Sequence, residues 1–504
     1  MGGCFLGVDI GTSSCKAIII DSKAKVLSSA TVEYFLDFSH EGTWAEIDPE
    51  KWYQAAVEAI KRCMEKASVE GDKILAVGLS GQMVSLLGLD SEGAAVRPVI
   101  MWLDKRNVGE AEELKQLYGE KINEITCNPV NQQFTLPKLL WVKKHEPDNY
   151  KKINKIVLSK DYIRYRLTGE YATDCNDASG TLMYDIRKSE WSKEILDWLD
   201  IDENILPDIY PSTEITGRIT KKAAQETGLR EGTPVMAGSG DLGCENFACG
   251  VFEKGDCMMR LGSGAAITIP VNEPMLDPNL KGPCCGYYKK DIFLIQGMTQ
   301  AFGSVMRWVR DAFSGGVSEE VFKEDAFESL CDMAECVPIG SDGLIFNPFI
   351  NAAPYWKDYM QGGFIGVSPM HKLGHFVRAA MEGAACALKD AMTDLEEYGN
   401  TKIKECVVTG GGGKSRLWTQ IIANLIDKEL IIMPYADACT GAALMAAIGM
   451  GLDRKAMING LWESVDLIRV KPDGNMPKDL KMYEKYSRVH GLLDGLYQNL
   501  RNKG

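Results

Sequence analysis

No long uninterrupted run of apolar residues occurs in this 504-residue sequence. A bilayer-spanning helix needs about 18–20 such residues, so the sequence predicts no membrane span. Asp9 and Lys16 also interrupt the apolar N-terminal segment, which excludes a secretory signal of the usual form. We therefore expect a cytoplasmic protein with no membrane partner.

Positive charge is in short supply as well. Lys and Arg together number 56 against 70 Asp and Glu, which leaves a net charge of -14 and a pI near 5.1. A diffuse negative field repels nucleic acids and anionic lipid surfaces. We therefore expect no nucleic-acid partner, while a local basic pocket for phosphate is compatible with this balance.

Histidine is scarce, and no two of the 15 cysteines form a C-x-x-C pair. With five histidines and no paired ligand spacing, the sequence lacks the pattern of a zinc site. Several cysteines stand among apolar or small residues, namely Cys4, Cys15, Cys249, Cys386 and Cys439. This setting indicates reduced, buried thiols rather than a disulfide framework.

Apolar strand-like segments alternate with amphipathic helical patterns along the chain, which indicates an α/β fold. "FLGVDIG" and "KAIIID" read as the first two strands, and a helix is expected to begin with Asp48 as N-cap and Pro49 at its first position. Residues 105–235 are richer in Lys, Asp and aromatics and are expected to form an inserted helical segment. The chain is long enough for more than one hydrophobic core.

Two segments share one pattern, a strand followed by a turn of small polar residues and a second strand. They cover residues 5–20 and 257–269, and their repetition points to an ancestral duplication. Two similar halves that face each other form a cleft, where ligands tend to bind. A terminal helix is expected to pack on the body through one apolar face, which contains Tyr486, Val489, Leu493, Leu496 and Leu500.

Three glycine-containing corners follow strands and offer backbone N–H groups without bulky side chains. Such groups form an anion-binding nest, and a helix start adds positive dipole. None of the corners matches G-x-x-x-x-G-K-[ST] or the dinucleotide pattern G-x-G-x-x-G. An ordinary turn explains one corner alone, but three in strand contexts together favour a nucleotide. The corners contain Gly11, Thr12 and Ser13; Gly262 and Ser263; and Gly411 and Gly412.

Two acids stand in unusual positions. Asp9 lies on an otherwise apolar strand, where an unpaired carboxylate costs several kcal/mol. A Mg²⁺ ion held through water between Asp9 and phosphate oxygens would satisfy it. Asp241 lies between Gly240 and Gly243 and could accept a proton from a hydroxyl that attacks a phosphoryl group. The alternative for Asp241 is a turn aspartate bonded to its own backbone.

The ordered set of motifs resembles the FGGY carbohydrate kinases, and within them the xylulokinases. The segments that carry the resemblance are "GVDIGTSSCKAIIID", "GLSGQM", "IMWLDKR", "GSGDLG", "LGSGA" and "VVTGGGGKSRLW". The resemblance extends over nearly the whole chain. It implies a two-lobed α/β fold of the actin-like and hexokinase (ribonuclease H-like) type with a central cleft. We expect an N-terminal domain over residues 1–239, a C-terminal domain over 240–475 and a docked helix over 476–504.

The resemblance also implies a role for each matching residue, with ATP and Mg²⁺ as cofactors. It makes Asp241 the catalytic base and Asp9 the acid that assists the metal. It assigns ATP binding to Gly11, Thr12, Ser13, Gly262, Ser263, Gly411, Gly412 and Ser415, the last three at the adenosine end. It assigns the sugar site to Gln82, Met83, Trp102 and Asp241.

Three departures from the xylulokinase pattern concern the sugar. Val84 stands where the family usually has His, and Leu242 where it has Asn or Gln. The segment 350–360, "INAAPYWKDYM", lacks the family's acid and arginine. Each unpaired sugar hydroxyl that is buried costs ~1–3 kcal/mol, so these changes disfavour a fully hydroxylated ketopentose.

The leading hypothesis is an ATP-dependent kinase of a small ketose or polyol. The alternative is a sugar-binding sensor or regulator that keeps the fold with weak catalysis, and an actin-like or chaperone ATPase is a third reading. The identity of the sugar, the hydroxyl that is phosphorylated and a homodimeric state are left open by the sequence.

Overall fold

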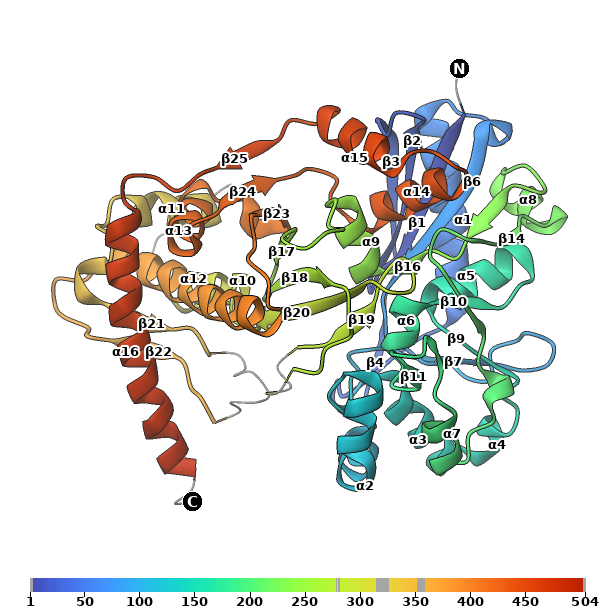
Figure 1. Cartoon of the computed structure of the whole chain (residues 1–504), viewed down its shortest axis with the longest axis horizontal. Helices are drawn as coiled ribbons and strands as arrows, with labels where there is room; N and C mark the ends of the chain where they lie inside the picture. Colours follow the sequence, from blue (N-terminus) through green and yellow to red (C-terminus); the bar gives the residue numbers. More distant parts are fainter. Residues whose placement is uncertain (1–2, 278, 280–281, 314–325, 351–358, 502–504) are drawn as a thin grey trace.

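The computed structural model describes residues 3–277, 279, 282–313, 326–350 and 359–501. Two seven-stranded sheets form the centres of two lobes (Figure 1). The first sheet contains β1 (Cys4–Ile10), β2 (Ser14–Asp21), β3 (Val26–Glu33), β6 (Ile74–Gly81), β14 (Ile215–Arg218), β15 (Pro234–Met236) and β16 (Ser239–Gly240). The second contains β17 (Met258–Leu261), β18 (Ala265–Val271), β19 (Cys284–Gly286), β20 (Phe293–Thr299), β23 (Glu405–Thr409), β24 (Glu429–Ile432) and β25 (Ile468–Val470).

Six strands of each sheet follow the same order, while β16 of the first sheet and β19 of the second have no counterpart. In the first, β1 pairs antiparallel with β2 and parallel with β6; in the second, β17 pairs antiparallel with β18 and parallel with β23. Beyond the hairpin, an antiparallel strand follows in each sheet, β3 in the first and β20 in the second. On the other side a parallel strand follows, β15 or β24, and then an antiparallel strand, β14 or β25. This correspondence is the one expected from the repeated strand–turn–strand pattern.

Helices cover both faces of each sheet. On the outer faces lie α1 (Pro49–Ala67), α5 (Ser159–Thr168) and α8 (Lys221–Thr227) in the first lobe, and α10 (Gly303–Phe313), α12 (Leu373–Tyr398) and α13 (Arg416–Ile426) in the second. Helix α1 begins as predicted, because Asp48 accepts a hydrogen bond from Glu50 N at 2.9 Å and Pro49 occupies the first turn.

Between the sheets lie α9 (Asp241–Ala248) and α14 (Ala438–Gly449). One apolar cluster includes residues of both helices and of both sheets, from Phe5 on β1 to Val407 on β23. Helix α14 lies directly on the first sheet, since a Cβ at Gly7 would be 2.1 Å from the Cys439 carbonyl oxygen. Only glycine allows this contact, and the shared apolar cluster joins the two lobes.

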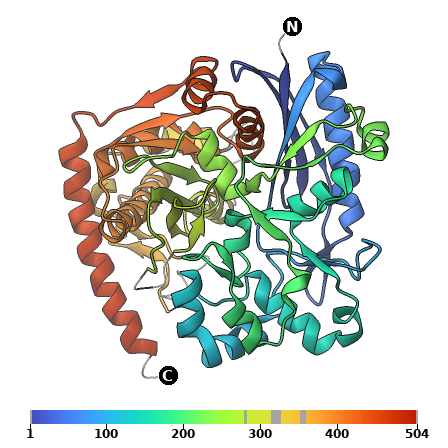
Figure 2. The same cartoon turned by 45° about the vertical axis from the view of Figure 1, so that its right-hand side comes forward.

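The segment after residue 105, coloured teal and green in Figure 2, forms the predicted helical insertion with a core of its own. The prediction is wrong at its end, because β14 and β15 leave the insertion and join the first sheet. The insertion contains α2 (Val108–Thr126), α3 (Thr135–His145), α4 (Pro147–Tyr150), α6 (Cys175–Ser179) and α7 (Lys193–Trp198), with β9 (Lys155–Val157), β10 (Ala172–Asp174), β11 (Tyr184–Asp185), β12 (Glu190–Trp191) and β13 (Asp208–Tyr210).

The remaining elements are peripheral. They are β4 (Asp37–Ser39), β5 (Trp44–Ile47), β7 (Leu87–Leu89), β8 (Val99–Ile100), β21 (Ile345–Asn347), β22 (Gly363–Ile365), α11 (Ala326–Glu335), α15 (Arg454–Glu463) and α16 (Met476–Arg501). None of the described helices is both long enough and apolar enough to cross a bilayer.

The terminal helix α16 is most deeply buried in its first half, and its second half contacts the second lobe through Tyr359, which donates to Asp494 Oδ1 at 2.7 Å. Tyr486 is 2% exposed, whereas Leu496 and Leu500 are 51% and 58% exposed. The prediction of one continuous buried stripe is therefore wrong in the last turns. The reason is geometric, because α16 runs along the side of the lobe and its C-terminal end projects past α12 (Figure 1).

Candidate active site

The register of the first sheet places the two predicted acids at one edge. Asp9 on β1 is opposite Ser80 on β6, and Ser80 is opposite Ser239 on β16. All three strands run parallel, so the residues that follow them leave the sheet on the same side. Gln82 follows β6 directly, and Asp241 follows β16 directly.

Asp241 is the first residue of α9 and is half-buried. Its Oδ1 accepts a hydrogen bond of 2.8 Å from Leu242 N, as in the turn aspartate that was the alternative reading. Helical spacing places Glu245 one turn later on the same face. The N-terminal end of α9 therefore presents two carboxyl groups between the lobes.

The first corner is a tight turn braced by a tyrosine. Gly11 N donates to Ser14 O at 2.9 Å, and Tyr34 N donates to Ser13 O at 3.0 Å. Trp102, which is 37% exposed, donates from Nε1 to Thr12 Oγ1 at 2.9 Å. The structure thus brings together a residue assigned to phosphate binding and one assigned to the sugar wall.

The second corner is held by the start of α10. Gly262 N donates to Gly264 O at 2.9 Å, and Ser304 N donates to Ser263 O at 2.9 Å. Arg307 donates from Nη2 to Ser263 Oγ at 2.6 Å, which adds a cation to this corner. The sequence reasoning missed Arg307, although its place one turn into an amphipathic helix could have indicated a residue near that helix start.

The third corner adjoins the second. Gly410 has a φ of 87° and a Cβ there would lie 2.6 Å from Leu261 O, so only glycine fits. A Cβ at Gly412 would lie 2.9 Å from both Leu261 Cβ and Phe302, whereas Gly411 faces open space. Ser415 is the N-cap of α13 and accepts from Trp418 N at 3.3 Å.

Four carboxyl groups and two cations meet between the lobes, and we call them the charge cluster: Asp9, Asp241, Glu245, Asp437, Lys16 and Arg260. Lys16 pairs with Asp437, the N-cap of α14, and Arg260 of β17 pairs with Glu245. The second pair links the strand that leads into Gly262 with the helix that begins at Asp241. Neither pair was predicted, because no local spacing reveals them.

The charge cluster perturbs two of its acids. Burial raises the pKa of Asp9 to about 7, with further contributions from Asp241 and other carboxylates. Burial also raises the pKa of Glu245 to about 7, although Arg260 opposes the change. Asp9 Oδ1 is buried and accepts no hydrogen bond from any residue that the structure describes. The unpaired Oδ1 and the excess of two acids over cations fit the charge of one divalent cation, whereas no three His, Cys, Asp or Glu side chains among the described residues are grouped as direct metal ligands.

In the loop that is predicted to face the sugar, the side-chain amide of Gln82 points into the protein. Gln82 is 3% exposed, and its Nε2 lies 3.6 Å from Met101 Sδ. Met83 is half-buried against Gly240, and Val84 has a φ of 59°. A β-branched residue in the left-handed region is strained. Leu242, the second departure, packs in the apolar cluster between the sheets; residues 351–358 of the third departure lie outside the described residues.

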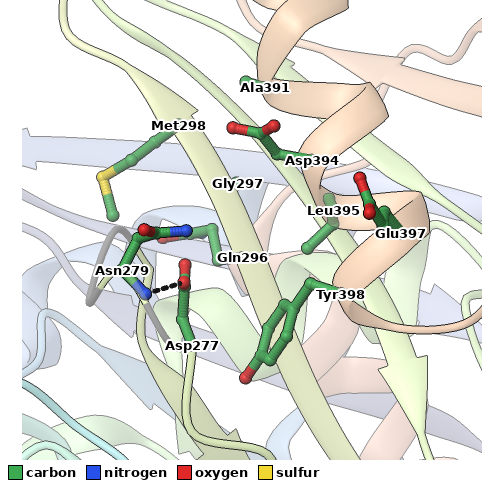
Figure 3. Close-up of a pocket in the computed structure, with 10 residues that line it drawn as sticks. All are labelled: Asp277, Asn279, Gln296, Gly297, Met298, Ala391, Asp394, Leu395, Glu397 and Tyr398. Atoms are coloured by element: carbon green, nitrogen blue, oxygen red, sulfur yellow. Dashed lines mark hydrogen bonds between the residues drawn. The ribbon is translucent and has the colours of Figure 1, made fainter.

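A separate cavity of about 240 Å³ lies between β20 and α12 (Figure 3). Its lining includes Asp277, Gln296, Asp394 and Tyr398. None of the residues predicted for the nucleotide or sugar site contributes to it. The candidate site is defined by the strand edge and the three corners, not by this cavity.

Two matching sheets joined through buried helices, with glycine corners at their strand ends, define an actin-like ATPase fold. Solved structures share it along the whole chain. The xylulose kinase of Rhodospirillum rubrum has a TM-score of 0.89 at 26% identity and covers 98% of this chain and 100% of its own. The gluconate kinase of Lactobacillus acidophilus has a TM-score of 0.88 at 26% identity and covers 99% of both chains.

The chain belongs to the FGGY family of carbohydrate kinases. The model of the family's N-terminal domain matches residues 4–248, and that of its C-terminal domain matches residues 256–450. Relatives include the xylulose kinase of Bacillus subtilis, 32% identical over 449 residues, which are 88% of each chain. The gluconokinase of the same organism is 28% identical over 457 residues, 90% of this chain and 88% of its own. The protein is therefore a carbohydrate kinase.

Proposed function

We propose that this protein transfers the terminal phosphoryl group of ATP to a hydroxyl of a small ketose or polyol, with Asp241 as general base. The register that aligns Asp9, Ser80 and Ser239 carries the proposal. It places a buried acid and the acid at the start of α9 at one edge of the sheet. A sensor that only binds sugar needs no such pair.

In this proposal each group has a physical task. The N–H groups of the corners and Arg307 bind the phosphates, and the half-buried Asp241 accepts the proton of the attacking hydroxyl. Asp9 would hold Mg²⁺ through water, and that ion would neutralise charge on the phosphates. We expect closure of the two lobes over the substrate to exclude water from the reacting groups, because ATP hydrolysis would otherwise compete with transfer.

Replacement of Asp241 by Asn tests the base. The amide keeps the shape and the 2.8 Å contact with Leu242 N but cannot accept the proton. We expect turnover to fall by about 10²–10⁴-fold with ATP binding and thermal stability retained. A coupled ADP assay and calorimetric titration of ATP measure the two effects. Full turnover in this variant would remove Asp241 from the role.

Xylulose is the first substrate to test, because curated relatives at about 30% identity are xylulose kinases. Fold similarity does not choose the sugar, since the xylulose and gluconate kinase structures match about equally well. Val84, which stands where the xylulokinase pattern has a polar residue, favours a substrate with fewer hydroxyl groups or the sensor alternative, whereas Leu242 packs in the apolar cluster between the sheets. A panel of ketoses, polyols and aldonates, read by phosphorylated product and by binding, separates these cases: binding of a sugar without any product supports the sensor.

A further inference from the structure

Five ionisable side chains are sealed beneath the strand edge that leads to Asp241. They are Lys160, Asp161 and Arg164 of α5, Asp174 at the end of β10 and Asp177 of α6, and each is 0% exposed. Lys160 Nζ lies 2.6 Å from Asp161, 2.9 Å from Asp177 and 3.2 Å from Asp174. Arg164 Nη1 lies 2.9 Å from Asp161. We call this set the buried ionic network.

Stability alone is a poor explanation for such a network. Desolvation of buried ions offsets most of their attraction, and apolar replacements of buried ion pairs are often neutral or stabilising. The hydrogen bonds that leave the network are therefore the informative feature.

One group of these hydrogen bonds is made to the chain segment directly before Asp241. Ser239 Oγ donates to Asp174 Oδ2 at 3.0 Å, and Ser239 is two residues before Asp241. Arg164 donates from Nη2 to the carbonyl oxygen of Ala237 and, at 3.3 Å, to that of Met236. Three residues that precede Asp241, namely Met236, Ala237 and Ser239, are thus hydrogen-bonded to buried charged side chains.

A second group of contacts holds the sugar-facing loop. Ser159, the residue before Lys160, donates from Oγ to Gln82 O at 2.8 Å. A Cβ at Gly81 would lie 3.1 Å from Lys160 N, so α5 begins against the end of β6. The same short helix end therefore supports the loops of both Gln82 and Asp241.

The proton content of the network follows from its charges. Two cations face three carboxyl groups, and burial raises the pKa of Asp177 well above its usual range. With Asp177 protonated, Lys160 and Arg164 balance Asp161 and Asp174. Asn is then nearly isosteric and isoelectric with the native side chain at position 177.

We propose that Asp174 and Lys160, acting through Ser239, are positioning residues that hold Asp241 in place for proton transfer. The proposal rests on the proposed function, since it assigns these residues to the same reaction. It extends the catalytic assembly from α9 to the inserted segment, which no residue of the glycine corners reaches.

Ser239→Ala removes the link and leaves the charges intact. We expect kcat to fall at least tenfold with KM for ATP changed less than twofold, because only the geometry of Asp241 is altered. Asp174→Asn should lower kcat at least as much. In the double variant Ser239→Ala with Asp174→Asn, the serine change should lower kcat by less than a further twofold, because both changes remove the same hydrogen bond. Asp177→Asn should keep at least half of the native kcat.

Arg378→Met is the matched control. Arg378 and Glu382 of α12 form another buried pair at 2.8 Å, with side chains 7% and 3% exposed. We expect this variant to lose thermal stability but to keep the kcat of its folded fraction. Hydrogen exchange of the backbone from 238 to 244 should accelerate in Ser239→Ala and Asp174→Asn and stay native in Arg378→Met.

Several results would overturn the proposal. One is a native kcat and native hydrogen exchange in Ser239→Ala. Another is a double variant, Ser239→Ala with Asp174→Asn, whose loss of kcat is the product of the two single losses. A third is an Asp177→Asn variant that loses as much activity as Asp174→Asn. Failure of the proposed function has a different signature: the native protein phosphorylates no member of the panel, or Asp241→Asn is fully active. The exchange measurement still decides the positioning claim in that case.

Discussion

At the scale of single residues, Asp9 shows how burial changes the pKa of a carboxyl group. Its carboxyl group lies in an apolar strand, and its pKa of about 7 reflects the cost of ionisation there. A nearby divalent cation favours the ionised form. We therefore expect the proposed binding of Mg²⁺ near Asp9 to be accompanied by release of a proton.

Asp9→Asn should stabilise the ligand-free protein at pH 8 by about 2–4 kcal/mol and change little at pH 4. The sign follows from the raised pKa: the native carboxyl group is protonated in the folded state at low pH, and its stabilising contribution is lost as pH rises toward 7. Urea unfolding at the two pH values measures this. The same variant should lose Mg²⁺-dependent ATP binding, and a pH-independent effect on stability would contradict the argument.

At the scale of elements, the third corner contains one glycine that packs against the protein and one that is free to face a ligand. Neighbouring glycines there have different surroundings, because Gly412 faces Leu261 and Phe302 while Gly411 faces open space. The corner is held by β23, α13 and the stacked rings of Phe302 and Trp418, whose centroids are 4.0 Å apart. Its shape is therefore fixed before any ligand binds.

Gly411→Ala and Gly412→Ala form a matched pair of variants. The first should keep the melting temperature and raise KM for ATP about tenfold, since its methyl group projects into the corner where phosphate or adenosine is expected. The second should lower the free energy of unfolding by about 1–3 kcal/mol through overpacking. Calorimetry and steady-state kinetics distinguish them. An unchanged KM for ATP in Gly411→Ala would show that the corner is not the nucleotide site.

At the scale of the whole molecule, the Arg260–Glu245 pair connects the sheet of one lobe to the helix that carries Asp241. The pair is partly exposed, with 37% of the Arg260 side chain and 17% of the Glu245 side chain accessible to solvent. A change at the pair is therefore expected to affect stability and catalysis together.

Arg260→Met should lower the free energy of unfolding by about 1 kcal/mol at pH 8 and by less at pH 6, because the Arg260 side chain is 37% exposed and solvent screens part of its attraction to Glu245. Without the cation, the pKa of Glu245 rises above about 7, and the carboxyl group takes up a proton in acid. The double change Arg260→Met with Glu245→Gln should restore most of the stability at pH 8. Chemical unfolding at both pH values is the measurement, and failure of the second change to restore stability would contradict the pairing.

Much of the fold was predictable because its signals are local. The strand–turn–strand repeat, the cap at Asp48 and the glycine corners are set by side chains within a few positions, and the structure confirms the elements they predict. The terminal stripe was wrong from Leu496 onward because helical periodicity reports an apolar face but not the length of the surface that it meets.

The sequence by itself determined the class of fold, the family and the corners, since these depend on backbone conformation and short spacing. Tertiary structure alone decided which charges meet. Lys16 and Asp437 are 421 positions apart, and the residues of the buried ionic network are 62 to 79 positions away from Ser239. Coulombic and hydrogen-bond partners are selected by distance in space, and only the packing of the sheets and the insertion brings those side chains within reach.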